Sequence, residues 1–355
     1  MKVLKFGGTS VGSAQRMKEV AKLITDGEQK IVVLSAMSGT TNTLVEISDY
    51  LYKKNPEGAN EIINRLEAKY KQHVNELYST DEYKQKTQEF IKAQFDYIRS
   101  YTKDIFTLFE EKVILAQGEL ISTNMVTNYL QEQGVNAILL PALEFMRTDK
   151  NSEPDPVYIK EKLAAQLEIH PDAEIYITQG FICRNAYGEI DNLQRGGSDY
   201  TASLIGAAVN ASEIQIWTDI DGMHDNDPRI VDKTSPVRHL HFEEAAELAY
   251  FGAKILHPTC VQPAKYANIP VRLLNTMEPT APGTLISNDT EKGKIKAVAA
   301  KDNITAIKIK SSRMLLAHGF LRKVFEIFES YQTSIDMICT SEVGVSVSID
   351  NSQSE

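Results

Sequence analysis

The sequence predicts an α/β fold built on an open, mainly parallel sheet. Short β-branched runs alternate with helical patterns, and the first runs close on Gly, Ser or Thr. Between the first two runs, at about residues 15–26, lies a pattern typical of a crossover helix. Strands that alternate with helices in this way are typical of parallel sheets. In such sheets, ligands bind outside the carboxyl ends of the strands.

The expected elements follow in chain order. Strands are expected at residues 3–6, 31–34, 137–140, 175–178, 214–217 and 271–274. From about residue 56 to residue 130, apolar side chains such as Ile63, Leu66 and Tyr70 recur at three- and four-residue steps. This spacing predicts a packed helical layer rather than a cofactor site.

The C-terminal part predicts a second, smaller domain. The charged stretch 288–294 is interpreted as a linker, after which the pattern restarts. A strand at 304–309, a helix at 319–331 and strands at 335–338 and 343–348 are expected there. A βαββ unit of this size buries its sheet face poorly, so we expect it to pair with another copy or chain. The expected domains are residues 1–290 and 297–355.

Composition narrows the class of protein. The chain has 355 residues, of which 42% are hydrophobic, enough for one large core and a smaller one. Its 38 basic and 48 acidic residues are interspersed and give a net charge of −10, which disfavours nucleic acid and anionic membranes as main partners. The N-terminus has no apolar segment of signal-peptide length, and no stretch approaches a membrane span, so a soluble, cytoplasmic protein is expected. Its three cysteines lie far apart and predict neither a disulfide framework nor a zinc site.

The first strand leads into the segment KFGGTSVG, residues 5–12, before a predicted helix. Glycines let backbone N–H groups approach phosphate oxygens, and a helix N-terminus favours anions. Lys5 adds a mobile positive charge at the same strand end. The spacing matches neither a Walker loop nor a dinucleotide fingerprint. Alone, the segment leaves a phosphate loop and an ordinary tight turn equally open.

Two further polar loops follow predicted strands. Residues 35–42 supply hydroxyl and amide groups, and residues 194–202 form a second Gly-Gly turn before a helix of small residues. The latter places Arg195, which can hold a carboxylate through two hydrogen bonds, four positions before Asp199. Gly-rich loops with opposite charges at several strand ends favour an anion-binding site over surface turns.

A fourth loop, residues 217–229, is rich in aspartate. It does not have the spacing of an EF-hand, because Gly222 follows only two acids and no Glu closes the loop. We interpret it as a nucleotide-side loop with Arg229 directed at phosphate. His239 and His241 alternate on an expected strand or loop and lack a third ligand, which favours surface or packing roles over a metal site.

These motifs together resemble those of aspartokinases, a branch of the amino-acid kinase family. The resemblance covers nearly all of the chain and rests on residues 5–11, 194–202, 217–219, 227–229 and 251–258. It implies the amino-acid kinase fold, a three-layer αβα arrangement with an open, mainly parallel sheet. The implied reaction is ATP-dependent phosphorylation of the side-chain carboxylate of L-aspartate to 4-phospho-L-aspartate, the first step towards lysine, threonine and methionine.

The resemblance also implies roles for individual residues. Lys5 and Asp199 are the implied catalytic residues. The implied phosphate- and ATP-binding residues are Lys5, Gly7, Gly8, Thr9, Thr218, Asp219, His224, Arg229 and Lys254. The implied aspartate-binding residues are Ser35, Thr41, Glu119, Phe181, Arg195 and Ser198, with Glu119 on the α-ammonium group. Mg²⁺ is expected to bridge the ATP phosphates, with no set of protein ligands. His224 departs from a Tyr that many relatives carry near the adenine.

The C-terminal βαββ unit resembles an ACT domain of the lysine-responsive type. The resemblance places Met314, Leu321, Ile335 and Asp336 near the inhibitor, L-lysine. Ala317 replaces an expected Ser, and a second ACT repeat is absent, which we interpret as truncation with weakened or lost feedback. A homodimer is expected.

Two alternative functions stay open from the sequence. One is another amino-acid kinase, of the acetylglutamate or glutamate type. The other is a catalytically silent amino-acid sensor, in which the kinase fold serves only as a scaffold. The presence of Lys5, Glu119, Arg195 and Asp199 argues against the silent sensor.

Overall fold

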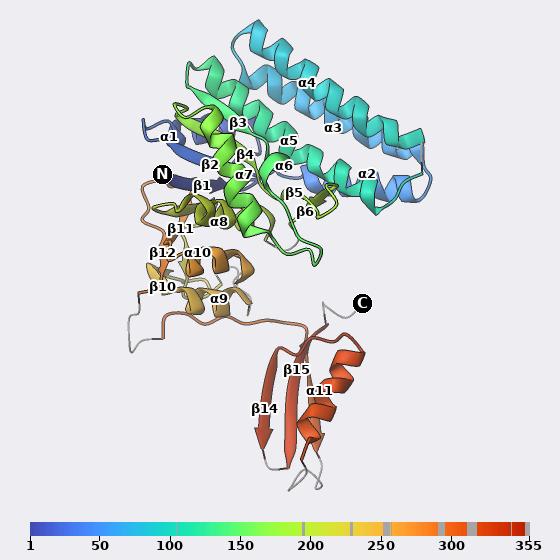
Figure 1. Cartoon of the computed structure of the whole chain (residues 1–355), viewed down its shortest axis with the longest axis vertical. Coiled ribbons are helices and arrows are strands. Elements are labelled where there is room, and N and C mark those ends of the chain that lie inside the picture. The colour runs from blue at the N-terminus through green and yellow to red at the C-terminus, as the bar shows by residue number, and fades with distance from the viewer. Residues whose placement is uncertain are drawn as a thin grey trace. The chain divides into compact units, whose positions relative to one another are not determined.

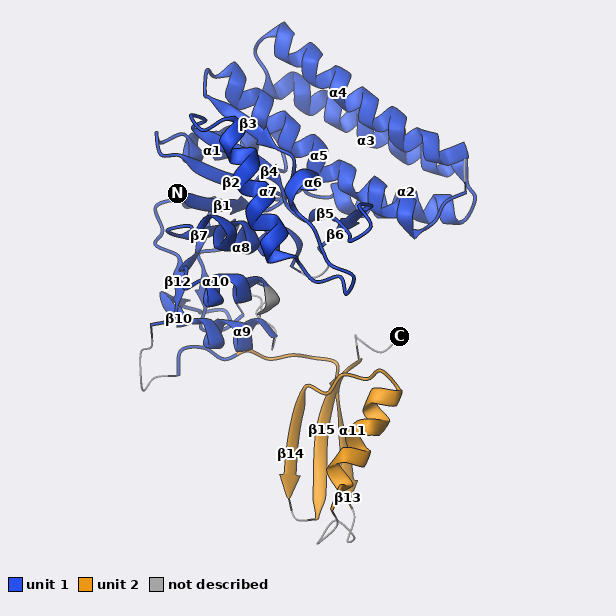
Figure 2. Ribbon diagram, in the orientation of Figure 1, with its two compact units in different colours: residues 1–298 blue, residues 299–355 orange. Residues whose placement is uncertain are grey.

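The computed structural model describes residues 1–103, 105–193, 196–227, 230–250, 256, 258–289, 295–310, 318–341 and 343–351. The chain forms two compact units, residues 1–298 and 299–355 (Figure 2). The expected domain limits, 1–290 and 297–355, stay a prediction. Among the described residues, no helix is both long and apolar enough to cross a membrane.

The first unit is built on an eight-stranded sheet with the order β10-β12-β11-β7-β1-β2-β4-β3. These strands are β1 (Lys2–Phe6), β2 (Lys30–Leu34), β3 (Ala137–Leu140), β4 (Ile175–Gln179), β7 (Ile214–Thr218), β10 (His239–His241), β11 (Val271–Asn275) and β12 (Thr284–Ser287). All neighbours pair in parallel except β11 with β12. The six strands predicted from sequence are confirmed within one residue at each end.

Helices cover both faces of this sheet. One apolar core joins the sheet to α1 (Ala14–Ile24), α2 (Thr40–Tyr52), α3 (Pro56–Leu77), α4 (Asp81–Ser100) and α5 (Leu108–Glu132). The opposite core joins it to α6 (Ala142–Phe145), α7 (Pro156–Ile169), α8 (Gly197–Val209), α9 (Phe242–Tyr250) and α10 (Gln262–Tyr266). Adjacent residues of β1 divide between the two cores, Val3 in one and Leu4 in the other, as strand geometry requires. Three layers result, and Figure 1 shows α3, α4 and α5 side by side.

Several short elements were not predicted from the sequence. They are the hairpin of β5 (Ile182–Arg184) and β6 (Ile190–Asn192), the pair β8 (Met223–His224) and β9 (Pro236–Val237), and the 3₁₀ turns at Tyr101–Lys103 and Pro258–Val261. Strand β12 at the edge of the main sheet was also missed, and its neighbour β10 was expected only as a strand or a loop at His239 and His241. The strands among them have only two to four residues, too short for a clear period.

The central strands β7, β1, β2 and β4 are parallel, so their carboxyl ends share one edge of the sheet. Loops that follow β1, β2 and β4 lie against each other there. Ser35 N–H donates to the Phe6 carbonyl at 3.2 Å, and Gly180 N–H donates to the Leu34 carbonyl at 2.9 Å. This edge carries the candidate site.

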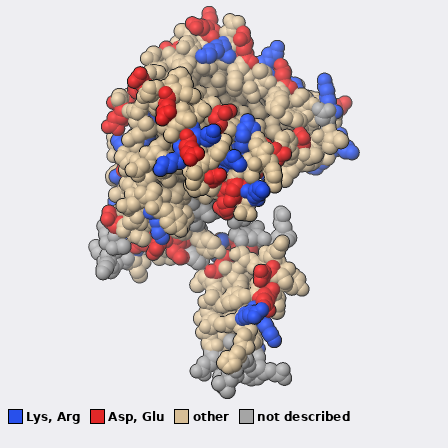
Figure 3. All heavy atoms as spheres, in the orientation of Figure 1, with Lys and Arg blue, Asp and Glu red and all other residues tan. Residues whose placement is uncertain are grey.

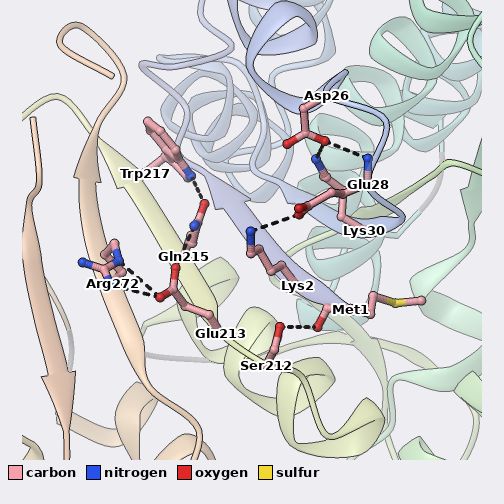
Figure 4. Close-up of polar contacts among 10 residues, drawn as sticks. All are labelled: Met1, Lys2, Asp26, Glu28, Lys30, Ser212, Glu213, Gln215, Trp217 and Arg272. Atoms are coloured by element: carbon pink, nitrogen blue, oxygen red, sulfur yellow. Dashed lines mark hydrogen bonds and ion pairs between the residues drawn. The ribbon is translucent and has the colours of Figure 1, made fainter. Parts of the chain in front are cut away.

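Charged residues hold the opposite, amino-terminal edge together (Figure 4). Lys30, whose side chain is only 2% exposed, pairs with Asp26. Lys2 Nζ lies 3.0 Å from Glu28 in a far more exposed pair, and Arg272 pairs with Glu213 at 3.2 Å. On the visible face of the first unit, basic and acidic side chains are interspersed (Figure 3).

The Asp26 pair should matter more to stability than the Lys2 pair. Asp26→Ala leaves the buried Lys30 ammonium without its carboxylate, and we expect a loss of about 1–3 kcal/mol in the free energy of unfolding. Glu28→Ala is the matched control, and it should cost less than about 1 kcal/mol because its Lys2 partner stays solvated. Urea unfolding of both variants measures the difference, and equal losses would contradict the prediction.

The second unit is a three-stranded antiparallel sheet in the order β13-β15-β14 with one helix. Its elements are β13 (Ile304–Lys310), α11 (Phe320–Ser330), β14 (Met337–Ser341) and β15 (Gly344–Asp350). The predicted βαββ order is confirmed, but β14 begins two residues later than predicted. The ladder with β15 starts only at Met337, opposite Ser348.

Candidate active site

A pocket of about 370 Å³ opens at the carboxyl ends of the central strands. It collects eight of the residues singled out in the sequence: Lys5, Gly8, Ser35, Thr41, Glu119, Phe181, Ser198 and Asp199. They come from β1, from the loops after β2 and β4, and from α2, α5 and α8. Residues far apart in the chain thus form one site.

An ion pair lies in this pocket. Lys5 Nζ is 2.7 Å from Asp199 Oδ1, and the two side chains are 11% and 15% exposed. Lys5 is fixed on β1, while Asp199 belongs to the first turn of α8, where the helix favours a negative charge. The lysine ammonium is therefore held at a defined position facing the pocket.

The loop after β1 presents free backbone donors. The N–H groups of Gly8 and Thr9 donate no hydrogen bond to any residue that the structure describes. Ser10 N–H closes the turn by donating to the Gly7 carbonyl at 3.0 Å. A Cβ on Gly8 would lie 2.8 Å from the Ala36 carbonyl oxygen, so only glycine fits. The free N–H groups beside Lys5 suit the oxygens of a phosphate.

Hydroxyl groups also line the pocket. Ser35 Oγ donates to Ser198 Oγ at 2.9 Å, joining the loop after β2 to the start of α8. Phe181 has a φ of +69°, a left-handed conformation that is uncommon for a residue other than glycine. Its N–H is held by Thr201 Oγ1 at 3.0 Å. Strain of this kind is found at functional sites more often than elsewhere.

Glu119 supplies a buried carboxyl group from α5. Its side chain is almost inaccessible, with 3% of the residue exposed, and Oε1 accepts the Ala36 N–H at 3.2 Å. Oε2 is buried without a hydrogen-bond partner among the described residues. Burial raises the pKa of Glu119 to about 8, and the Ala36 N–H opposes that rise. A cation bound in the pocket would satisfy Oε2 and favour the carboxylate.

Two of the predicted nucleotide-binding residues, Lys5 and Gly8, line this pocket, whereas Gly7, Thr9, Thr218, Asp219 and His224 are not among its lining residues. Thr218 ends β7, the neighbour of β1, and Asp219 follows it. His224 lies on β8, where Nδ1 is 2.8 Å from Thr234 Oγ1. Gly7 and Thr9 belong to the loop after β1. Four predicted residues lie outside the described part of the chain: Arg195, Arg229, Lys254 and Met314.

Two contacts made by close sequence neighbours of predicted site residues could not be found from the sequence. Arg238 forms two hydrogen bonds of 3.0 Å with Asp221, and this contact lowers the pKa of the Asp221 carboxyl. Tyr70, predicted as a packing residue, also places its hydroxyl 2.8 Å from Thr40 Oγ1, next to Thr41 of the pocket. No motif marks these partners, which come together only in the fold.

The predicted regulatory residues belong to the second unit. Leu321 is exposed on α11, and Ile335 and Asp336 precede β14. Asp336 N–H donates to the Ser348 carbonyl at 2.8 Å. Their role in binding an inhibitor stays a prediction.

Comparisons with known proteins identify the family. Residues 1–275 match the model of the amino acid kinase family. The chain is 38% identical over 369 residues to the chloroplastic aspartokinase 1 of Arabidopsis thaliana, covering 99% of this chain and 63% of that protein. It is 35% identical to lysine-sensitive aspartokinase 3 of Escherichia coli (strain K12), covering 99% of this chain and 79% of that one.

A solved structure agrees. The crystal structure of Escherichia coli aspartokinase III in complex with aspartate and ADP matches with a TM-score of 0.85 at 34% identity, over 99% of this chain and 79% of that one. The chain thus spans less than two thirds of the plant relative, at 63% of its length, and more of the bacterial one. It belongs to the amino acid kinase family, in the aspartokinase branch.

Proposed function

We propose that this chain transfers the γ-phosphoryl group of ATP to the side-chain carboxylate of L-aspartate, giving 4-phospho-L-aspartate and ADP. The observation that carries the proposal is a single pocket holding the Lys5–Asp199 ion pair, free N–H groups and the buried Glu119. These groups can bind a phosphate and an amino acid together. The relative crystallised with aspartate and ADP supports the same pair of ligands.

In the proposed reaction, a carboxylate oxygen of aspartate attacks the γ-phosphorus. A new P–O bond forms, the bond from γ-phosphorus to the β–γ bridging oxygen breaks, and ADP leaves with that electron pair. The substrate carboxylate is already ionised at neutral pH, so no general base is required. Lys5 would neutralise charge that develops on the phosphoryl oxygens, and Asp199 would hold the lysine in place.

Glu119 would bind the α-ammonium group of aspartate through Oε2. Ser35, Ser198, Thr41 and Phe181 would surround the rest of the amino acid. The prediction that Arg195 holds a substrate carboxylate completes this half of the site. The proposed Glu119 contact separates aspartate from amino acids with a blocked amine, such as acetylglutamate, because those carry no ammonium group for Glu119 to bind.

The nucleotide would occupy the neighbouring strand end. Its proposed contacts are Gly7, Gly8, Thr9, Thr218, Asp219, His224, Arg229 and Lys254. We propose that Mg²⁺ enters as part of MgATP, bound by phosphate oxygens and water. Within the described ranges, no group of three or more His, Cys, Asp or Glu side chains could hold a metal. We assign no step to the ion.

A coupled assay of ADP formation tests the proposal. Wild-type protein should form ADP from MgATP only when L-aspartate is present, and not when N-acetylglutamate or glutamate replaces it. Hydroxylamine should trap the product as an aspartyl hydroxamate, because acyl phosphates react with that nucleophile. Turnover with acetylglutamate and none with aspartate would sink the assignment. Calorimetry that shows binding of lysine, but binding of neither MgATP nor aspartate, would instead favour the silent sensor.

We further propose that residues 297–355, which include the second unit, form an ACT regulatory domain that responds to L-lysine. The name of the lysine-sensitive Escherichia coli relative supports this ligand. The contacts would be Met314, Leu321, Ile335 and Asp336. A homodimer, a cytoplasmic location and a place at the start of lysine, threonine and methionine synthesis belong to the same proposal. Adding L-lysine to the assay tests the regulatory part directly.

A further inference from the structure

A chain of hydrogen bonds joins three strand ends beside the pocket. Ser10, in the loop after β1, lies 3.2 Å from Thr276 through their hydroxyl oxygens. Thr276 follows β11 and donates from Oγ1 to the Thr218 carbonyl, the end of β7, at 2.9 Å. The Thr276 N–H donates to the same carbonyl at 2.8 Å. Strands β11, β7 and β1 are consecutive in the sheet, so this chain crosses three adjacent strands.

The donors and acceptors in this chain have only one arrangement. A carbonyl oxygen can only accept, so the single Thr276 hydroxyl proton points to Thr218. Thr276 Oγ1 must then accept the proton of the Ser10 hydroxyl. Both hydroxyl residues are buried, with 1% of Ser10 and 8% of Thr276 exposed, so water cannot readily replace either bond.

Both ends of this chain of hydrogen bonds lie next to groups that are proposed to bind ATP. Ser10 closes the turn from Gly7, next to the free N–H groups of Gly8 and Thr9. Thr218 ends the strand at which the nucleotide is proposed to bind. Thr276 lies just beyond the part of the chain that matches the family model, residues 1–275.

We infer that Thr276 is a positioning residue for the nucleotide: its hydroxyl fixes the distance between the phosphate loop and the end of β7. The inference rests on the proposed function, because it assumes that ATP spans these two elements. Thr276 itself need not touch the ligand. It acts through Ser10 and Thr218. Loss of its hydroxyl should therefore not change the affinity for aspartate, which is proposed to bind on the other side of Lys5.

Thr276→Val is the test because it keeps the shape and removes the hydroxyl. It leaves the buried Ser10 hydroxyl without its acceptor and frees the loop to move. We expect the KM for ATP and the Kd for MgADP to rise roughly fivefold to tenfold, the size of one lost buried hydrogen bond. The KM for aspartate should change less than about twofold. Thr276→Ser restores a hydroxyl and should restore nucleotide binding.

Thr127→Val is the matched control. Thr127 is also buried, with 4% exposed, and its hydroxyl donates to the Thr123 carbonyl at 2.8 Å within α5. Both valine variants should lose similar stability, which the fluorescence of Trp217, the only tryptophan, can follow. Only Thr276→Val should weaken the binding of MgADP, as measured by calorimetry on the full chain.

The outcomes separate the two proposals. If the wild-type protein binds no MgADP, the proposed function fails and not this inference alone. If the wild-type protein binds MgADP and Thr276→Val binds it equally well, the inference is overturned even though the kinase assignment stands. Parallel rises in the KM values for ATP and aspartate would also overturn it, because they indicate a general loss of structure.

Discussion

Replacing Lys5 with Met should lower kcat by about 10²-fold or more, because in the proposed reaction the lysine charge acts on the transferring phosphoryl group. The ammonium lies 2.7 Å from Asp199 and beside the free N–H groups of the loop after β1. Charge on the phosphoryl oxygens grows in the transition state, so the loss should fall on kcat more than on the KM values. Steady-state kinetics by ADP formation measures both.

Lys2→Met is the matched control for this substitution. Lys2 lies on the same strand at its opposite end and is 40% exposed in its pair with Glu28. Its removal should change kcat by less than about twofold, because the exposed pair is distant from the site. Trp217 fluorescence confirms that both variants are folded. A Lys5→Met enzyme that keeps more than a tenth of the wild-type kcat would exclude a transition-state role for this charge.

Much of the fold could be predicted because a clear local sequence pattern identifies its main strands. Each is a β-branched run of four or five residues between turn residues, and burial on both faces makes such runs almost wholly apolar. Edge strands β10 and β12 lack this pattern. His239 and His241 alternate with a buried Leu240, and nothing in the local sequence shows that β12 is their partner.

The site was predictable where chemistry depends on residue type and not where it depends on tertiary contacts. Lys5 and Asp199 were both implied as catalytic residues, and the structure brings the two side chains together in an ion pair. Ser10 and Thr276 are 266 positions apart in the sequence, and they come into contact only because of the order of the strands in the folded sheet. Likewise, the sequence places Glu119 on a helix but cannot show that one of its oxygens is buried without a partner.

That oxygen leads to a pH dependence. Because burial raises the pKa of Glu119 to about 8, the group is largely protonated at neutral pH when the pocket holds no cation. In the proposed complex the aspartate ammonium pairs with the Glu119 carboxylate, so the binding of aspartate releases a proton. We expect kcat/KM for aspartate to rise up to about tenfold per pH unit below pH 8 and to level off above it. The pH dependence of kcat should be weaker, because the bound ammonium lowers the pKa of Glu119.

Glu119→Gln tests this assignment. The variant keeps an acceptor for the Ala36 N–H but loses the charge, so its KM for aspartate should rise by roughly 10²-fold. Its kcat/KM should no longer change with pH through this range. A Glu119→Gln enzyme that keeps the wild-type pH profile would show that another group titrates.

Stability should move in the opposite direction from activity. The folded state holds the Glu119 proton up to about pH 8, whereas the unfolded chain releases it near 4.5. Between these values the unfolded state binds fewer protons, so this group lowers the free energy of unfolding as pH rises. Glu119→Gln removes that loss and should be more stable than wild type above pH 8, with the gain vanishing below about 4.5.

Glu132, on the same helix, provides a control of opposite sign. Partial burial opposes the shift, but hydrogen bonds from Thr80 and Ser79 lower its carboxyl pKa, so it stabilises the fold above its unfolded pKa. Glu132→Gln should therefore lose stability at neutral and higher pH and approach wild type in acid. Thermal unfolding of both variants, followed by Trp217, should give curves that diverge from wild type in opposite directions as pH rises. A shift of the same sign in both would mean that the buried Glu119 is already ionised, with its charge satisfied inside the protein and not by the substrate.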